Sequence, residues 1–387
     1  VAIGLGSLGN STTGSGNTAV GRSALNANTT ASNNTAVGYE TLAANTTGTQ
    51  NTALGTFSLD QNTTADYNTA IGYNSMGDNT TGTQNTAVGH RSLKSNSTAN
   101  NNTAVGYHAL EENTTGTDNT AVGSNALQSA TTASNNTAIG DVTLSTNTSG
   151  ADNTAVGASC LSANTSGNFN TGIGCRTLNN NTTGTGLCAV GEDALLNNTT
   201  GIQNNAMGQS AMRLHTTGSY NVAIGANTLA NSTSGANNTA IGHASLNGIT
   251  NGHANAAVGY QSLFAVTTGD DNTAMGEQAA ANLTTGDRNT SIGKAAGYAL
   301  TTGSNNLLLG DDAGRSNSPS GTVDTGSNVV CLGDNLISSL FCADTSISSS
   351  DSRDKTDVTD FTKGLDWVKA LRPVTYRWDR RTWYGTD

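Results

Sequence analysis

A five-residue motif, Asn-Thr-Ala-Val-Gly at residues 17–21, returns every 17 residues over more than 300 residues of this chain. Its central alanine defines one column of the repeat, with the successive positions Ala2, Ala19, Ala36, Ala53, Ala70, Ala87, Ala104, Ala121, Ala138, Ala155, Gly172, Ala189, Ala206, Ala223, Ala240, Ala257, Ala274, Ser291 and Leu308. A period kept without a slip gives every unit the same surroundings, stacked on its neighbours. The chain is therefore predicted to fold as a long, stiff array of one repeated unit.

The composition separates this array from a disordered chain and from a binder of nucleic acid. Only 4% of the residues are aromatic and 11% are charged, yet Val or Ile follows the motif alanine in most units, and Leu or Met comes five residues later. Disordered segments lack such periodic apolar positions. The net charge of −11 is spread thinly, which predicts no nucleic-acid partner. No apolar run is long enough to span a bilayer, which predicts no membrane insertion.

One repeat has the length of one coil of a β-solenoid. In an extended segment Thr18 and Val20 lie on one side, while Ala19 lies on the other. β-Branched residues favour strands, whereas Gly, Asn and the Asn-Thr-Thr-Gly segments favour turns, so each repeat accommodates two short strands and two turns. We therefore expect an all-β solenoid or β-roll shaft, whose narrow interior is filled by the leucine column, typified by Leu25, together with Val20 and its equivalents.

The asparagine that opens each motif forms a further column, which runs from Asn17 to Asn306 and is interrupted once, at Leu187. Amide side chains stacked in register can hydrogen-bond along the stack, as they do in cross-β assemblies. This predicts a structural role for these asparagines rather than glycan attachment at the many Asn-x-Thr sequences.

The small apolar content of each coil predicts association between chains. Two large apolar residues per coil contribute little against the entropy lost on ordering the whole unit. Further apolar burial is therefore expected from other chains, with the small alanine column letting their backbones approach. We expect a homotrimer. The handedness of the coils is left open, and so is the choice between self-contained and interwound chains.

The motif copies at residues 17–21 and 221–225 resemble repeats in the heads of trimeric autotransporter adhesins, and similar repeats occur in phage tail-fibre shafts. The resemblance implies β-roll coils assembled in threes. It leaves two settings for such a shaft, a phage particle and a bacterial surface.

Aromatic residues gather in the column three residues after the motif alanine. Tyr39, Tyr73 and Tyr107 occupy it at 34-residue spacing, and His90 lies in the same column. Rings two coils apart would be separated by about 9–10 Å, which suits stacking on sugar rings. The alternative is an exposed, tolerant column that drifted after a tandem duplication. These four residues are the candidate receptor-binding or glycan-binding surface.

The period breaks after Gly310, because the next motif copy, at residues 330–333, comes 23 residues after Leu308 rather than 17. We predict a solenoid shaft over residues 1–310, an irregular terminal coil and capping region over 311–345, and a different C-terminal segment over 346–387. That last segment holds all three tryptophans and half of the basic residues. Its apolar spacing predicts a helix over 361–371, ended by Pro373, and then a strand over 374–378.

Residues 350–378, with Ser350-Asp351-Ser352-Arg353-Asp354-Lys355 followed by Gly364-Leu365-Asp366-Trp367 and Leu371-Arg372-Pro373-Val374-Thr375-Tyr376-Arg377-Trp378, resemble the start of the endosialidase-type intramolecular chaperone. That family is a self-cleaving module that brings three chains into register on trimeric phage fibres and spikes. The resemblance implies Ser350 as the cleavage serine, Lys355 as its dyad partner, and the Ser350–Asp351 bond as the cleaved bond. The family domain extends beyond Trp378, so we expect this sequence to hold only its start.

The leading hypothesis is the structural shaft of a trimeric phage tail fibre, located on the virion. It takes part in host attachment, with other fibre or baseplate proteins and a cell-surface receptor as partners. The alternative is a bacterial trimeric surface adhesin. A third class, ice binding, is suggested by threonine columns such as Thr29 and Thr46. No carboxylate pair recurs at a fixed position, so no glycan-cleaving enzyme is expected in the shaft. No metal or cofactor is predicted.

Overall fold

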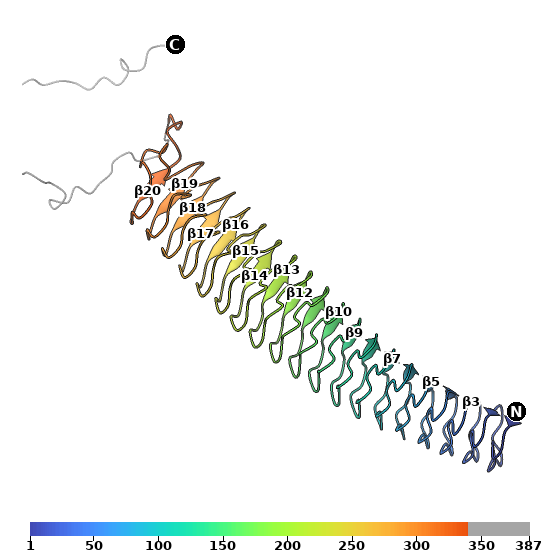
Figure 1. Cartoon of the computed structure of the whole chain (residues 1–387). Coiled ribbons are helices and arrows are strands. Elements are labelled where there is room, and N and C mark those ends of the chain that lie inside the picture. The colour runs from blue at the N-terminus through green and yellow to red at the C-terminus, as the bar shows by residue number, and fades with distance from the viewer. Residues whose placement is uncertain (340–387) are drawn as a thin grey trace, which may run out of the picture. The chain divides into compact units, whose positions relative to one another are not determined.

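The computed structural model describes residues 1–339, in which twenty strands form one parallel sheet along an elongated solenoid (Figure 1). The strands are β1 (Ala2–Ile3), β2 (Thr18–Val20), β3 (Thr35–Val37), β4 (Thr52–Leu54), β5 (Thr69–Ile71), β6 (Thr86–Val88), β7 (Thr103–Val105), β8 (Thr120–Val122), β9 (Thr137–Ile139), β10 (Thr154–Val156), β11 (Thr171–Ile173), β12 (Cys188–Val190), β13 (Asn205–Met207), β14 (Val222–Ile224), β15 (Thr239–Ile241), β16 (Ala256–Val258), β17 (Thr273–Met275), β18 (Thr290–Ile292), β19 (Leu307–Leu309) and β20 (Val330–Leu332).

Each strand pairs in parallel with the strands of the neighbouring coils of the same chain. Ala19 lies opposite Ala36, so the register of the sheet equals the sequence period. The last pairing spans the longer step, with Leu308 opposite Cys331. The predicted all-β solenoid of 17-residue repeats is therefore confirmed, and its coils are self-contained. Among the described residues, no helix is long and apolar enough to cross a membrane.

Each coil carries one strand of two or three residues rather than the two short strands that we expected. Turns form the rest of the coil, and three non-glycine residues in most coils adopt left-handed conformations, for example Ser23 (φ 60°), Leu25 (φ 52°) and Asn33 (φ 59°). The turns also bond between coils, because the N–H of Leu25 donates to the carbonyl of Thr41 at 3.1 Å. Inter-coil hydrogen bonds therefore continue well beyond the strands.

The strand side chains alternate between the interior and the outer surface. Ala19 is fully buried, whereas Thr18 and Val20 are half-buried on the outside. The expectation that Val20 shares the interior with Leu25 is therefore wrong, and the alanine column packs inside its own chain rather than against another. Leu25 is fully buried, as predicted. In most coils leucine and asparagine side chains already fill the thin interior, so a methyl group is what fits beside the strand. In the last coils Gly297 and Gly314 leave room for the buried Leu308 at this position.

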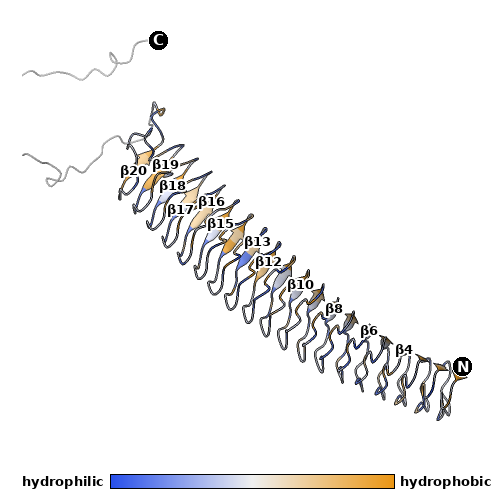
Figure 2. Cartoon of the chain, in the orientation of Figure 1, coloured by the Kyte–Doolittle hydropathy of each residue, from blue (hydrophilic) through white to orange (hydrophobic). Residues whose placement is uncertain are grey.

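The outward-facing apolar column of the strands is called the outer stripe below. Figure 2 shows apolar residues gathered on the strands, between more polar turns. The stripe continues from the first strand to the last and consists of Ile3, Val20, Val37, Leu54, Ile71, Val88, Val105, Val122, Ile139, Val156, Ile173, Val190, Met207, Ile224, Ile241, Val258, Met275, Ile292, Leu309 and Leu332.

The asparagine column forms the predicted ladder along the stack. Asn17 Oδ1 accepts a hydrogen bond from the backbone N–H of Asn34 at 2.9 Å, and Asn17 Nδ2 donates to the carbonyl of Ala31 at 2.8 Å. The same two bonds recur in most coils. At the single interruption, the N–H of Leu187 still donates to Asn170 Oδ1 at 3.0 Å. Each buried amide therefore ties its own coil to the next one.

A second buried amide ladder, which the sequence analysis missed, begins at Asn28. Asn62 Nδ2 donates to Asn45 Oδ1 at 2.9 Å, and this bond recurs along the column. The ladder stops where Ala130 or His215 replaces asparagine, which leaves Asn113 Oδ1 and Asn198 Oδ1 buried without a partner. Towards the C-terminal end, apolar side chains take over this column. They include Val266, Leu283 and Leu300, all of which are fully buried.

The glycine that closes each motif turns the chain at a corner that admits no side chain. Gly38 has φ 142°, and a Cβ added there would lie 2.6 Å from the carbonyl oxygen of Gly55 in the next coil. Other residues rarely adopt this conformation. The invariable glycine of the repeat is therefore a requirement of backbone geometry.

The buried side chain of His215 is expected to make the stability of the folded solenoid depend on pH. The side chain is fully buried, with Nε2 2.8 Å from the carbonyl oxygen of Gly218 and Nδ1 3.2 Å from Ser232 Oγ. Burial lowers the pKa of His215, so the unfolded chain binds the proton more readily than the folded one. The free energy of unfolding therefore keeps its full value above the pKa of this histidine in the unfolded chain, near 6.5. It is expected to fall as the pH drops below that value.

Replacing His215 by asparagine is expected to weaken this acid sensitivity. An asparagine donates to Gly218 as its column neighbours do, and it also satisfies Asn198 Oδ1, which adds about 1 kcal/mol. Thermal unfolding followed by circular dichroism at pH 7.5 and pH 5 measures both effects. The exposed His253 provides the matched control, since His253→Asn leaves the interior intact. Equal pH dependence in His215→Asn and the parent would contradict the assignment.

Candidate functional site

The candidate aromatic residues project from the corner that follows each strand. Tyr73 comes after β5 and Gly72, and Tyr107 comes after β7 and Gly106. The positive φ of the glycine turns the chain away from the sheet, so the next side chain points outward. Tyr73 is 49% exposed and Tyr107 is 53% exposed. The four predicted residues therefore lie in one column beside the outer stripe.

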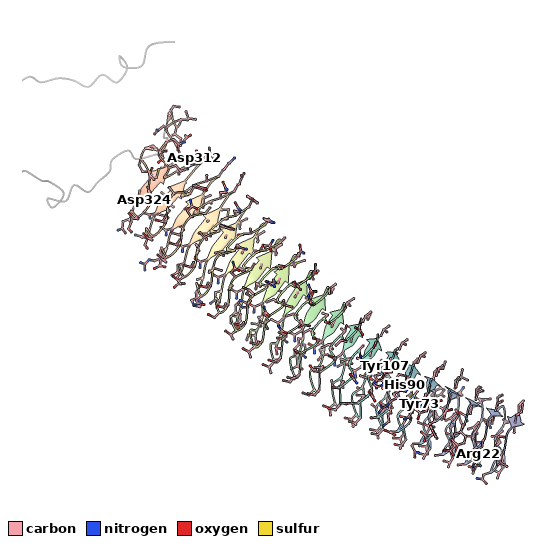
Figure 3. All side chains as sticks on the ribbon, in the orientation of Figure 1. Arg22, Tyr73, His90, Tyr107, Asp312 and Asp324 are labelled. Carbon is pink, nitrogen blue, oxygen red and sulfur yellow. The ribbon has the colours of Figure 1, made fainter. Side chains whose placement is uncertain are left out.

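The structure brings these residues into one row of contacting rings. The centroids of Tyr73 and His90 are 5.4 Å apart at 15°, and those of His90 and Tyr107 are 5.3 Å apart at 17°. Figure 3 shows the three side chains following one another along the solenoid. Tyr39 joins the row through Phe57, with centroids 5.5 Å apart and the rings nearly perpendicular. The predicted gaps of two coils are therefore filled by other rings.

Two members of this row, Phe57 and His108, were missed because they lie in the next column along the sequence. Phe57 lies 6.1 Å from Tyr73, and His108 stacks 3.8 Å from Tyr107, between ring centroids. The available signal was their position directly after a residue of the aromatic column, at a turn where neighbouring side chains converge. The six residues Tyr39, Phe57, Tyr73, His90, Tyr107 and His108 are called the ring ladder below.

A buried carboxylate supports the C-terminal end of the ring ladder. Glu111 Oε1 lies 2.8 Å from Arg91 Nη2, and Glu111 Oε2 lies 2.8 Å from His108 Nδ1. Gln128 Nε2 also donates to Glu111, at 3.3 Å. Burial lowers the pKa of His108, with Arg91 and His90 adding to it, although Glu111 opposes the shift. His108 is therefore held mainly neutral near pH 7 in a fixed orientation by three neighbouring coils.

The threonine columns have a structural role in this fold. Thr29 Oγ1 donates to the carbonyl of Thr46 at 3.2 Å, and Thr46 Oγ1 donates to the carbonyl of Thr63 at 3.0 Å. The same bond recurs along the column, so these hydroxyl protons join coils to one another. Among residues 1–339, no group of three His, Cys, Asp or Glu side chains is placed to hold a metal ion.

The C-terminal residues are compared through their sequence, since Ser350 and Lys355 lie outside the described residues, as do the predicted helix over 361–371 and strand over 374–378. Residues 350–385 match the family described as the chaperone of endosialidase. The match begins at Ser350, the residue for which the resemblance implies cleavage. No curated protein matches the chain. The matched residues are called the chaperone segment below.

A β-solenoid followed by a chaperone segment suggests a phage tail-fibre-like protein. A long array of equivalent coils allows neighbouring chains to align in many registers. A chaperone that fixes one register is therefore a physically suitable partner for such a shaft. The shaft and the intramolecular chaperone inferred from the sequence are both supported.

Proposed function

We propose that this chain is the shaft subunit of a homotrimeric phage tail fibre that takes part in host attachment. The match of residues 350–385 directly beyond the solenoid carries the proposal. On this view the protein is located on the virion. Its partners are two further copies of itself, other fibre or baseplate proteins and a receptor on the host cell, for which the predicted column of Tyr39, Tyr73, His90 and Tyr107 is the candidate surface.

The outer stripe supports self-association. Ile139 is 40% exposed and Ile173 is 43% exposed, and the intervening coil carries Val156 in the same column. A continuous apolar row of this length marks an interaction surface rather than scattered exposed side chains. Copies of the same chain are the natural occupants, because a parallel copy repeats at the same axial rise and matches every coil. Three chains would bury the stripe around a common axis.

The repetition of the shaft explains the need for a chaperone. Two chains can slide past one another by one coil and still place apolar residues against apolar residues, since all coils are alike. A separate module that fixes the three C-terminal ends removes this degeneracy. In the sequence the chaperone segment follows the last coils of the shaft, so in this proposal the alignment of the chains begins at their C-terminal ends.

Ser350 and Lys355 then have defined roles in release of the chaperone. A serine hydroxyl is a weak nucleophile until a nearby base takes its proton, and a lysine of lowered pKa provides such a base. In this proposal Lys355 takes the hydroxyl proton of Ser350 and passes it to the leaving amino group of Asp351 as the Ser350–Asp351 amide bond breaks. Water completes the hydrolysis and leaves a carboxylate on Ser350. The cut leaves the folded shaft without its chaperone.

Replacing Ser350 by alanine in the complete gene product is expected to abolish cleavage. The parent should give a shaft fragment ending at Ser350, which mass spectrometry of the purified fibre identifies, whereas Ser350→Ala should stay uncut. Lys355→Ala should slow the cut strongly, because it removes the base. Ser349→Ala is the matched control and should be cut as the parent is. Cleavage of Ser350→Ala at the same bond would contradict the assignment.

The runner-up function is a trimeric bacterial surface adhesin, favoured by the resemblance of the motif to adhesin heads. It requires a secretion signal before the solenoid and a membrane anchor after it, both of which the sequence of the whole gene would reveal. Immunogold electron microscopy separates the two settings directly. Labelling of a cell-surface layer, with none on phage particles, would overturn the fibre proposal.

A further inference from the structure

The ring ladder has a composition that sets it apart on this shaft. Phe, Trp and Tyr make up only 4% of the chain, yet the ladder brings four of them together with two histidines over five consecutive coils. Its tyrosines remain partly exposed, with Tyr39 at 37%. Exposed rings contribute little to folding, so their concentration in one place points to contact with another molecule.

The stacking geometry leaves part of the ring faces open. Near-parallel rings whose centroids lie 5.3–5.4 Å apart are farther apart than the contact distance of about 3.5–4.0 Å between carbon atoms. The near-parallel rings must therefore be laterally displaced from one another, which is the offset stacking that aromatic pairs prefer. Tyr73 consequently presents a strip of its face as well as its hydroxyl group to the solvent. Tyr107, on which His108 stacks with ring centroids 3.8 Å apart, offers its free edge and its hydroxyl group. Such strips suit the C–H faces of pyranose rings.

Polar groups flank the ladder at both ends. The guanidinium of Arg22 lies 5.7 Å from the ring centroid of Tyr39 and closes the N-terminal end. At the other end Glu111 orients Arg91 and His108. The guanidinium groups of Arg22 and Arg91 carry hydrogen-bond donors that are suited to sugar hydroxyl groups at the edges of an apolar platform, whereas His108 Nδ1 is engaged by Glu111 and His108 Nε2 is buried.

The charges near the ladder favour an uncharged ligand. Arg91 is paired with Glu111, and Lys94 Nζ lies 3.0 Å from Asp78 Oδ2. At the N-terminal end Arg22 and Glu40 both lie near Tyr39 and act on it with opposite charges. No excess of positive charge remains to attract an acidic polysaccharide.

We infer that the ring ladder binds an extended, uncharged stretch of a cell-surface polysaccharide, with its pyranose rings lying along the shaft axis. This inference rests on the proposed function in host attachment, and it specifies the chemical class of the receptor that the shaft would bind. Phe57 joins the four predicted residues at this surface, while the largely buried His108 packs against Tyr107 and holds that ring in place. Arg91 fixes one end of the sugar chain through the donors that Glu111 leaves free.

The test compares tyrosines on and off the ladder in the full-length trimeric fibre. Tyr73→Ala/Tyr107→Ala removes two ladder rings, whereas Tyr67→Ala/Tyr220→Ala removes two tyrosines that are equally exposed, at 57% and 53%, but lie in another column. Binding is measured by biolayer interferometry to immobilised, purified bacterial surface polysaccharides, one set neutral and one set acidic. We expect the ladder variant to weaken binding to a neutral polysaccharide by about tenfold or more, and the control to leave it unchanged.

Three results would overturn the inference. They are the absence of binding to any neutral polysaccharide, equal weakening in both variants, and preferential binding of the acidic set. Sedimentation of each variant distinguishes a lost ligand surface from a lost chain interface. If the ladder variant no longer forms the trimer of the parent, the ladder is a contact between chains. A trimeric, correctly cleaved variant that binds as the parent does removes the ligand assignment and leaves the shaft function standing.

Discussion

Charged substitutions in the outer stripe are expected to separate the chains of the shaft while leaving each solenoid folded. The variant Ile139→Lys/Val156→Glu/Ile173→Lys places alternating charges on three consecutive coils. Within one chain these neighbours attract across the sheet, which protects the coil stack. In a parallel trimer each charge meets the same charge on the other chains and loses its water. Since even one such juxtaposition costs several kcal/mol, the variant is expected to sediment as a monomer.

The measurement combines sedimentation with circular dichroism, because the prediction concerns association and not folding. The matched control, Thr132→Lys/Ser149→Glu/Ser166→Lys, puts the same charges in a column that is exposed and polar on three coils of the same region. It should keep the oligomeric state of the parent. A stripe variant that remains as associated as its control would show that the stripe faces solvent in the fibre, and the interface would have to lie elsewhere.

The sequence predicts those features of the fold that depend on the period alone. The spacing of Ala19 and Ala36 fixes both the coil length and the register, because the same side chain recurs in the same surroundings. It also places Leu25 in the interior and aligns the amides of Asn17 and Asn34 into a ladder. These conclusions do not depend on the backbone path of the turns between equivalent positions of the repeat.

The side of the strand that faces inward could not be predicted, because hydrophobicity alone gives the wrong answer. Val20 is more apolar than Ala19, yet Ala19 is the buried residue. The deciding quantity is the space left beside Leu25 and the two asparagine columns, and that space depends on the path of the turns. The second amide ladder, from Asn28, was hidden for the same reason, since Asn-Thr-Thr-Gly resembles an ordinary exposed turn.

The backbone conformations of the turns do not follow the intrinsic conformational preferences of their residues. Leu25 adopts φ 52°, a conformation that costs a non-glycine residue about 1–2 kcal/mol, although a leucine is expected to avoid it. Full burial of the side chain and the hydrogen bond to Thr41 in the next coil offset this cost. A short run of residues therefore becomes a left-handed turn instead of a second strand. The same turn brings Phe57 and His108 into the ring ladder, which a column-by-column interpretation could not foresee.

One departure from the repeat predicts a steric coupling between two adjacent coils. Gly172 stands in the alanine column, and Cys160 stands in a column that otherwise holds Ala, Ser or Thr. A Cβ added at Gly172 would lie 2.6 Å from Cys160 Sγ, so the sulfur occupies the place of the missing methyl group. Both residues are buried, and burial raises the pKa of the Cys160 thiol to about 12, so it acts as an inert space-filling group.

Gly172→Ala alone is expected to overpack the interior and to cost about 1–3 kcal/mol. In the Cys160→Ser background the same change should cost little, because Ser58 already lies beneath Ala70 in an equivalent pair of coils, with Ser58 Oγ 3.4 Å from the carbonyl oxygen of Ala70. A double-mutant cycle on thermal midpoints gives the coupling. Hydrogen exchange at β11 locates it, since repeat arrays open locally. Equal losses from Gly172→Ala with cysteine or serine at position 160 would show that the two side chains do not compete for this space.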